Sequence, residues 1–335
     1  MTDSHDWALI LAGGRGRRMQ HLTRTVSGVP VPKQFCSLGR GPSLFYLALL
    51  RALRVAPPER ILVTLTEAHQ AWCKDLFAHL PHRNVLAQPE QRGTGIGILQ
   101  PLLEILERDP DAALVILPSD HYFLDEATIN TGLRKALRLT RTSQEPVILL
   151  GFEPDEPDTD LGYIVPGHAR SEELFAVRRF TEKPAADRVR TLLKHGALWN
   201  SFIVAANAAA LLAMFERRVP AVVAQVRDYM ARQSSRPASL AQLAEQFAAI
   251  PTLDFSEHII APAPHDFGVL RLAPCGWSDL GTPARLARVV QRHRADIERA
   301  PHAPAAMRGQ LDLAERIESR GSAWDSSASS LRSYP

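Results

Sequence analysis

Short apolar runs alternate with amphipathic stretches through the first 145 residues of the chain. The apolar runs are 8–12, 61–65, 84–87 and 112–117, and the stretches with helical spacing are 43–55, 71–80 and 96–107. Continuous apolar strands of this kind are typical of a parallel sheet that is covered by helices on both faces. The alternation therefore predicts a doubly wound α/β domain with right-handed crossovers.

The pattern changes after residue 145 and predicts a mixed sheet with an insertion and a helical C-terminal tail. We expect strands at 147–151, 162–165, 176–180 and 267–272, with the second and third antiparallel, and helices at 185–195, 207–217, 221–233, 239–250 and 283–300. An acidic, proline-containing loop occupies 153–160. The predicted division is a main domain of residues 1–285, a helical extension of residues 286–318, and a serine-rich tail of residues 319–335 that we expect to be disordered.

Composition narrows the class of protein further. The 335 residues are 45% hydrophobic and 22% charged, as in an ordinary globular protein. The formal charge is only +3 and its signs are interspersed, so the sequence lacks the cationic cluster expected of a protein that binds nucleic acid or an anionic membrane. The three cysteines are scattered and odd in number, which disfavours a disulfide framework or a zinc site. The first residues lack the features of a signal peptide and no apolar segment could span a bilayer, so we expect a cytoplasmic protein.

A glycine- and arginine-rich loop, LAGGRGRRM at 11–19, follows the first predicted strand. Its glycines and arginines are Gly13, Gly14, Gly16, Arg15, Arg17 and Arg18. Glycines let backbone amides approach a phosphate, and guanidinium groups bind phosphate oxygens through several donors. A plain turn with exposed arginines would show the same residues. The spacing matches neither a P-loop nor GxGxxG, so a nicotinamide-dependent dehydrogenase is disfavoured.

At this point the chain resembles a known family. The segment 11–19 is similar to the L-A-G-G-x-G-x-R-L motif of sugar-nucleotide pyrophosphorylases, and PKQF at 32–35 is similar to the segment that follows it in mannose-1-phosphate guanylyltransferases. Further blocks follow in the family's order, at 88–95, 117–121, 161–164, 180–184, 199–201 and 276–282. The resemblance covers roughly residues 7–285. It implies a Rossmann-like catalytic domain that joins a sugar 1-phosphate to a nucleoside triphosphate and releases pyrophosphate.

The resemblance also implies roles for particular residues. Catalysis would rest on Arg18, which polarises the triphosphate, on Lys33 near the phosphates, and on Asp120. The nucleotide-binding residues would be Leu11, Ala12, Gly13, Gly14, Gly16, Arg17, Arg18, Lys33, Gln88, Arg92, Gly93, Thr94 and Asp120. The sugar-phosphate-binding residues would be Gly162, Glu182, Lys183 and Asn200.

The implied reaction is an in-line attack of a phosphate oxygen on the α-phosphorus of the nucleotide. Such a reaction requires cations and a hard divalent metal rather than a covalent protein nucleophile, and Mg²⁺ takes one or two carboxylates together with phosphates and water. Following the family's pattern, we assign Asp120 and Asp279 as the Mg²⁺ ligands. Either aspartate alone would also fit an ordinary turn.

The identity of the base and of the sugar stays open. Guanylyltransferases usually have G-R-N-T-A where this chain has QRGTG at 91–95, and the block also resembles the uracil-binding loop of N-acetylglucosamine-1-phosphate uridylyltransferases. GTP with mannose 1-phosphate is the favoured pair, with UTP or another nucleotide and another hexose or a heptose as alternatives. Asp160 and Phe202 depart from the family, which has glycine at both positions. Asp254 is a candidate for the sugar pocket or for a helix N-cap.

Two other functions remain as alternatives. The chain could be a non-catalytic sugar-nucleotide sensor on the same fold, although Arg18, Lys33, Asp120 and Asp279 are retained. It could also be a glycosyltransferase, but 119–121 is not the D-x-D motif expected there. Apolar residues within 284–290 form a stripe that would dock on the same domain or on a second subunit of a homodimer.

Overall fold

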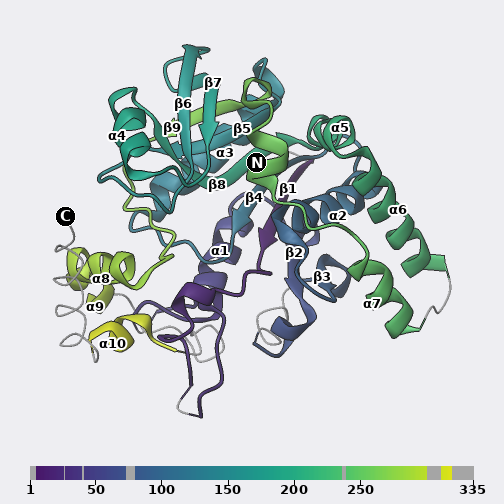
Figure 1. Ribbon diagram of the computed structural model, residues 1–335, viewed down its shortest axis with the longest axis horizontal. Coiled ribbons are helices and arrows are strands. Elements are labelled where there is room, and N and C mark those ends of the chain that lie inside the picture. Colours follow the sequence, from purple (N-terminus) through teal and green to yellow (C-terminus); the bar gives the residue numbers. More distant parts are fainter. Residues whose placement is uncertain are drawn as a thin grey trace.

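The computed structural model describes residues 5–25, 27–39, 41–72, 80–235, 239–299 and 311–318, and within them nine strands form one mixed sheet (Figure 1). The strands are β1 (Asp6–Leu11), β2 (Ile61–Thr66), β3 (Val85–Gln88), β4 (Ala113–Pro118), β5 (Val147–Phe152), β6 (Tyr163–Ala169), β7 (Leu174–Thr181), β8 (Leu198–Asn207) and β9 (Gly268–Leu272). Their order across the sheet is β3-β2-β1-β4-β8-β5-β9-β7-β6.

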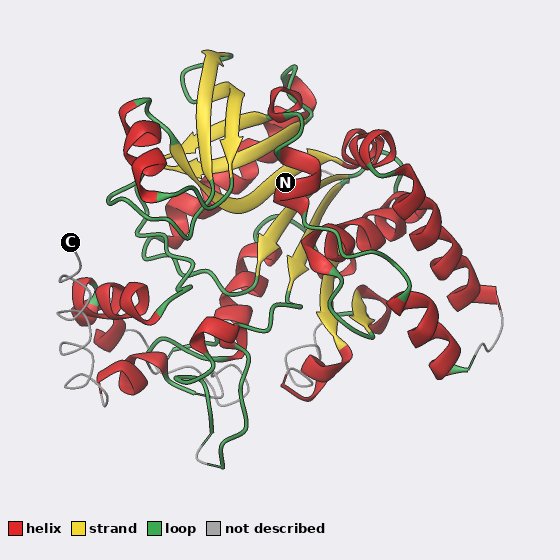
Figure 2. Cartoon of the chain, in the orientation of Figure 1, coloured by secondary structure: helices red, strands yellow, loops and turns green. Residues whose placement is uncertain are grey.

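Helices cover both faces of this sheet (Figure 2). They are α1 (Leu44–Leu53), α2 (Gly93–Arg108), α3 (Glu126–Thr142), α4 (Ala186–Lys194), α5 (Ala208–Arg218), α6 (Pro220–Ser235), α7 (Leu240–Ala248), α8 (Pro283–Arg292), α9 (Arg294–Arg299) and α10 (Leu313–Glu318).

Side chains that alternate along β1 enter two different hydrophobic clusters. Ile10 is fully buried in a cluster with residues of α1 and α3, whereas Leu9 is fully buried in a cluster with residues of α2 and α5. Successive side chains of a strand point to opposite faces, so each cluster fills one face of the sheet. The first four strands are parallel, with Ala8 opposite Ile61 on β2 and Val115 on β4. The doubly wound α/β architecture predicted from the sequence is confirmed.

The second half of the sheet is mixed, as predicted. Strand β8 runs antiparallel to both β4 and β5, and β6 and β7 form an antiparallel pair at the edge. Helix α4 follows β7, so β6, β7 and α4 form the compact unit that the sequence predicted as an insertion (Figure 1). A small core of its own, which includes Val165 and Leu192, lies inside this unit.

Some details differ from the sequence prediction, and others fall on residues that the structure does not describe. Strand β8 and helix α3 were not predicted. The single helix expected at 283–300 was wrong, because α8 ends at Arg292 and α9 begins at Arg294. Most of the helix expected at 71–80, and all of the tail at 319–335, lie outside the described residues.

The C-terminal segment packs on the same chain. Leu286, Val289 and Val290 of α8 are buried in the same cluster as Ile10, so the predicted apolar stripe docks on its own domain. Farther along, the Leu313 amide donates to the Ser37 carbonyl at 2.9 Å. Leu313 is fully buried, so α10 is anchored beside the segment that follows PKQF. None of the helices in the described part of the chain is long and apolar enough to cross a membrane.

We predict that Leu313→Ala lowers the free energy of unfolding by about 2–4 kcal/mol, because it leaves a cavity where a fully buried leucine packed. Chemical denaturation measures this difference. Leu240→Ala is the matched control, since Leu240 is also the first residue of a helix but is 84% exposed, and its loss should change stability by less than about 0.5 kcal/mol. Equal effects of the two substitutions would contradict the anchoring role of α10.

Candidate active site

The glycine loop leaves β1 at the carboxyl edge of the sheet and is held there by Gln34. The Gln34 side-chain amide donates to the carbonyl of Ala12 at 2.8 Å and to the carbonyl of Gly14 at 3.0 Å. Gly16 has a φ of 55°, in the left-handed region that glycine adopts without strain. The sequence analysis did not assign Gln34, yet its two hydrogen bonds explain why PKQF accompanies a glycine loop.

Lys33 brings together the two aspartates that were predicted to act as a pair. Its side chain is only 5% exposed, and Nζ lies 2.9 Å from Oδ2 of Asp120 and donates to the backbone carbonyl of Asp279. Asp120 follows β4 and Asp279 follows β9 in the chain, so two distant segments meet at one ammonium group. A Cβ atom added to Gly16 would lie 3.4 Å from Cβ of Lys33, which places the glycine loop beside this junction.

Asp279 is an ionised carboxylate in a buried setting. Burial is the largest single influence and acts to raise its pKa, but the positive charges of Lys33 and Arg285 outweigh it and hold the pKa at about 2. Arg285 donates directly to Oδ1, and the Gly281 amide donates to the same oxygen at 3.0 Å. The carboxylate is therefore fully charged at neutral pH and already has two donors.

His121 follows Asp120 and does not share its charge. The imidazole is buried against Trp277, whose indole nitrogen donates to Nδ1 at 3.2 Å. Burial lowers the pKa of His121 to about 4, so the ring is neutral at physiological pH. The positive charge beside Asp120 comes from Lys33.

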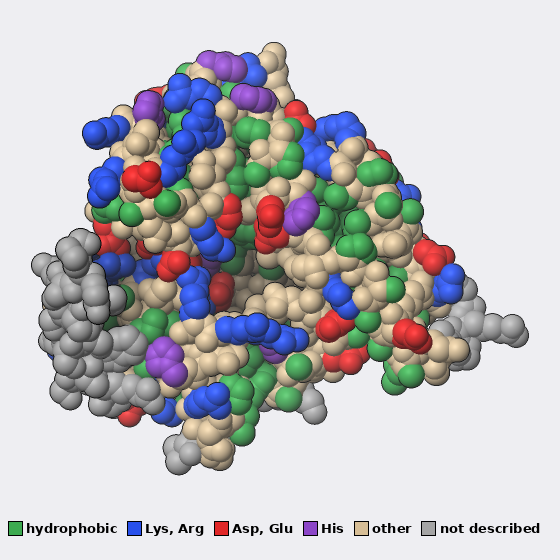
Figure 3. All heavy atoms as spheres, viewed as in Figure 1, with side chains coloured by type: hydrophobic (Ala, Val, Ile, Leu, Met, Phe, Trp, Pro, Cys, Tyr) green, Lys and Arg blue, Asp and Glu red, His purple; other side chains and the backbone are tan. Residues whose placement is uncertain are grey.

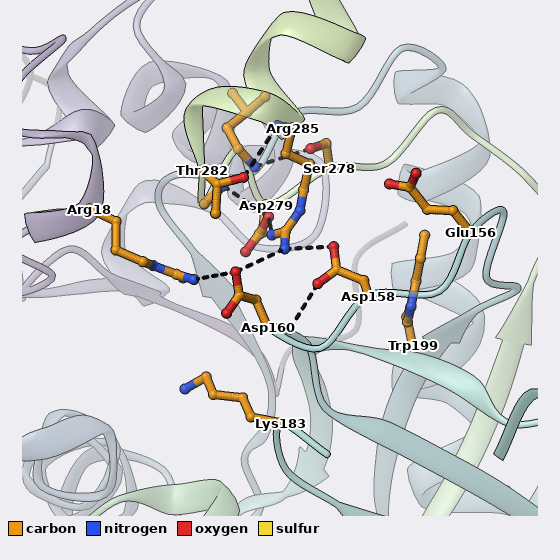
Figure 4. Close-up of polar contacts among 12 residues, drawn as sticks. Arg18, Glu156, Asp158, Asp160, Lys183, Trp199, Ser278, Asp279, Thr282 and Arg285 are labelled. Carbon is orange, nitrogen blue, oxygen red and sulfur yellow. Dashed lines mark hydrogen bonds and ion pairs between the residues drawn. The ribbon is translucent and has the colours of Figure 1, made fainter. Parts of the chain in front are cut away.

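Arg18 and Arg285 meet an acidic loop from the other half of the molecule (Figure 4). Arg18 pairs with Asp160 at 3.1 Å, and Arg285 pairs with Asp158 at 2.7 Å and lies 3.9 Å from Asp160. Asp160, at the position where the resemblance implies glycine, therefore forms an ion pair with the arginine that was predicted to bind the triphosphate. Arg285 was missed by the sequence analysis, and its only signal was its place six residues after Asp279 in a basic helix.

The same acidic loop is paired along the whole arginine face of α8. Arg288 contacts Glu156 at 2.5 Å and Arg292 contacts Asp155 at 2.5 Å. With Arg285 these arginines recur at spacings of three and four residues, which places them on one side of the helix. The loop 153–160 is therefore fixed between the glycine loop and the C-terminal helices.

The predicted sugar-binding residues Gly162, Glu182 and Asn200 are neighbours. A Cβ atom added to Gly162 would lie 2.8 Å from Oε2 of Glu182 and 3.3 Å from Cβ of Asn200, so a larger residue there would displace the Glu182 carboxylate. The backbone N–H of Asn200 donates to the Gly162 carbonyl at 2.8 Å. Burial raises the pKa of Glu182, and the nearby Lys183 ammonium, 3.4 Å away, partly offsets that effect. Lys183 itself is exposed and lies near the acidic loop in Figure 4.

The predicted base loop is tied to the segment that contains Leu253 and Asp254. A Cβ atom on Gly93 would lie 2.3 Å from the Leu253 carbonyl oxygen, and its φ of 86° also requires glycine. The Thr94 hydroxyl donates to Asp254 at 3.2 Å. Asp254 also accepts from the Glu257 amide, so it caps the turn that follows it.

Two other residues predicted for this loop already have protein partners. Gln88 is buried at the end of β3 and donates to Gln100 of α2 at 2.9 Å. Arg92 pairs with Glu90 at 2.5 Å. Gln88 therefore lies in the floor of the loop, and Arg92 is held at its edge.

The site lies at a hollow between the two halves of the molecule, and residues of both halves line it. In the space-filling view, acidic and basic side chains gather around this hollow, between the unit of β6, β7 and α4 and the unit of β1 to β3 (Figure 3). The described residues contain no cluster of three or more His, Cys, Asp or Glu side chains arranged for a metal ion. Lys33 contacts the Asp120 carboxylate and the Asp279 backbone carbonyl, so the two aspartates lie at one junction. A pair of carboxylates suits Mg²⁺, because that ion completes its shell with phosphates and water.

Known proteins resemble this chain over most of its length. The Xanthan biosynthesis protein XanB of Xanthomonas campestris pv. campestris (strain B100) is 29% identical over 288 residues, which cover 85% of this chain and 59% of that protein. A mannose-1-phosphate guanylyltransferase of Sinorhizobium fredii is 28% identical over 282 residues, which cover 82% of this chain and 52% of that protein. The chain thus spans little more than half the length of these relatives.

A solved structure and a family model complete the comparison. The structure described as a mannose-1-phosphate geranyltransferase from Thermus thermophilus is 27% identical, with a TM-score of 0.71 over 85% of this chain and 79% of the other. The model of the family described as nucleotidyl transferase matches residues 7–295. Since this match covers the glycine loop, the Lys33 junction and most of the arginine helix, the chain belongs to the nucleotidyl transferase family.

Proposed function

We propose that this protein is a magnesium-dependent sugar-1-phosphate nucleotidyltransferase that converts mannose 1-phosphate and GTP to GDP-mannose and pyrophosphate. The observation that carries the proposal is the contact of Lys33 with both Asp120 and Asp279 beside the glycine loop. We further propose that the enzyme acts in the cytoplasm, and a homodimer stays a prediction.

In the proposed reaction a phosphate oxygen of the sugar substrate attacks the α-phosphorus, and pyrophosphate leaves. The glycine-loop amides, Arg18 and Lys33 bind and orient the nucleotide phosphates, which is where a transfer of this kind needs positive charge. Asp120 and Asp279 would hold Mg²⁺, which supplies further positive charge to the phosphates when bound. Glu182 and Asn200 lie where they can orient the sugar through hydrogen bonds.

The choice of GTP and mannose rests on similarity and on local sequence. PKQF holds the glycine loop through Gln34, and the similarity to the Sinorhizobium fredii protein named mannose-1-phosphate guanylyltransferase supports this pair. The sequence of the base loop differs from G-R-N-T-A. Gly93 lets backbone groups of the loop approach a base, but it does not determine which base binds. UTP or another nucleotide with another hexose or a heptose 1-phosphate is therefore the alternative.

A substrate panel tests the reaction directly. Release of pyrophosphate is measured with GTP, UTP, ATP, CTP and dTTP against several sugar 1-phosphates, and GTP with mannose 1-phosphate should give the highest kcat/KM. A higher value for another pair would replace the substrate assignment. No release with any pair, together with measurable nucleotide binding, would favour the non-catalytic sensor.

The metal assignment is tested by Asp120→Asn and Asp279→Asn. Each should lower kcat/KM by roughly 100-fold or more and raise the Mg²⁺ concentration needed for half-maximal rate, because each removes a charged ligand at the phosphates. Asp155→Asn is the matched control, since that exposed carboxylate pairs with Arg292 at 2.5 Å and should leave turnover unchanged. Thermal melting checks that Asp279→Asn, which also loses its Arg285 contact, remains folded. Full magnesium-dependent activity in both active-site variants would show that Asp120 and Asp279 are not the Mg²⁺ ligands.

Asp160 should compete with the nucleotide for Arg18. The pair is about half exposed, 49% for Arg18 and 45% for Asp160, so its net strength is small. We predict that Asp160→Asn lowers the dissociation constant of the nucleoside triphosphate by about two- to fivefold, because Arg18 no longer has to exchange a carboxylate for a phosphate. Equilibrium dialysis with the variant, the parent chain and Asp155→Asn measures the effect. Weaker binding by Asp160→Asn would mean that Asp160 assists the nucleotide instead.

A further inference from the structure

A second cationic pocket lies outside the site described above, on the unit formed by β6, β7 and α4. Lys and Arg side chains gather over these elements in the space-filling view (Figure 3). The pocket has a volume of about 290 Å³ and is lined by Val165, Arg178, Arg179, Arg188, Thr191, Leu192 and His195. None of these residues is among those proposed to bind the nucleotide, the sugar or the metal.

A β-bulge explains how two successive arginines can line one pocket. Val165 lies opposite Arg179, whereas the next residue of β6, Pro166, lies opposite Val177, so Arg178 is an extra residue on β7. In a regular strand Arg178 and Arg179 would point to opposite faces. A bulge places two residues against one and re-aims a side chain, and such irregularities are found beside binding sites.

The arginines of this pocket differ from those that face the acidic loop. Arg285, Arg288 and Arg292 each pair with a carboxylate at 2.7 Å or less. By contrast, within the described parts of the chain the side chains of Arg178, Arg179 and Arg188 form no ion pair and no hydrogen bond with another protein group. Glu182, three residues after Arg179, contacts Lys183 instead. Cationic groups gathered without a counter-charge favour the binding of an anion.

The remaining walls suit a ligand with a small organic portion. Val165 and Leu192 are buried members of the small core of this unit, so they give the pocket an apolar floor. His195 stands at the end of α4, where its Nδ1 donates to the Thr191 carbonyl at 2.7 Å, and this bond fixes the ring at the rim. An apolar floor with a few convergent polar groups is the usual construction of a small-molecule site.

We propose that this pocket binds a small phosphate-bearing molecule. Guanidinium groups match phosphate oxygens through paired donors, and three of them together favour a doubly charged group over a single carboxylate. The volume suits a small ligand, since it lies near the lower end of the range for small-molecule sites. Arg179, Arg188 and the bulged Arg178 bind the phosphate, while Val165 and Leu192 contact the rest of the ligand.

Calorimetric titration with inorganic pyrophosphate, in the absence of divalent metal, tests the site. The full chain carrying Arg18→Ala is used throughout to weaken binding at the glycine loop. Adding Arg179→Ala and Arg188→Ala should weaken the remaining binding by about tenfold or more, because two charge-assisted hydrogen-bonding groups are lost. The matched control adds Arg190→Ala and Lys194→Ala, which removes the same charge from the same unit at residues that do not line the pocket.

Each outcome decides the proposal. Loss of binding in the pocket variant, with binding retained in the control, supports it. An equal loss in both variants would indicate a general charge effect and would overturn it. Absence of any pyrophosphate binding in the Arg18→Ala background, or binding that the pocket substitutions do not change, would also overturn it.

Discussion

The whole site depends on one buried ammonium group. Lys33 is 5% exposed, and a lysine removed from water in this way is strongly destabilising unless its charge is paired and its donors are used. Its Nζ atom meets both requirements with the Asp120 carboxylate and the Asp279 carbonyl. These partners lie far from Lys33 and far from one another in the chain, so the site is complete only when the two halves of the sheet are packed together.

Charges around this junction alternate in sign and extend across the molecule. Starting at the glycine loop, Arg18 pairs with Asp160, Asp160 lies near Arg285, and Arg285 pairs with Asp279. The backbone carbonyl of Asp279 accepts from Lys33. In this arrangement Arg18 and Lys33, which are proposed to bind the nucleotide phosphates, already have acidic or carbonyl partners. Polyanionic substrates and a divalent cation would therefore exchange partners with the protein rather than meet bare charges, which limits the electrostatic cost of the substrate-free state.

The sequence predicted the parallel half of the fold well because its strands are continuous apolar runs. Helix α3 was missed because 126–142 is polar and contains Gly132, which lowers helix propensity. The glycine leaves room for Leu272, since a Cβ atom there would lie 2.7 Å from a terminal methyl of that side chain. Strand β8 was missed because Asn200 and Ser201 interrupt its apolar pattern, and its register with β5 shifts at this point.

The motifs named the candidate site residues, but not the contacts that hold them. Lys33, Asp120 and Asp279 could be named from their blocks because short local sequences repeat across relatives. Gln34 and Arg285 could not, since a hydrogen bond to a glycine loop or an ion pair to a distant loop depends on how separate elements pack. Periodicity and local motifs carry no information about such partners.

A few residues have strained backbone conformations that the surrounding fold holds in place. Three non-glycine residues have left-handed backbones, Lys183 at φ 41°, Phe202 at φ 58° and Leu280 at φ 46°, among the residues that the structure describes. Each costs about 1 kcal/mol or more relative to a relaxed conformation, and strain of this kind persists only where the surrounding contacts fix it. Lys183 directly follows Glu182, Leu280 directly follows Asp279, and Phe202 lies two residues after Asn200. The left-handed backbone at Phe202 lies inside β8, in the stretch where the register of β8 with β5 shifts, so the strain there accompanies a strand irregularity beside Asn200.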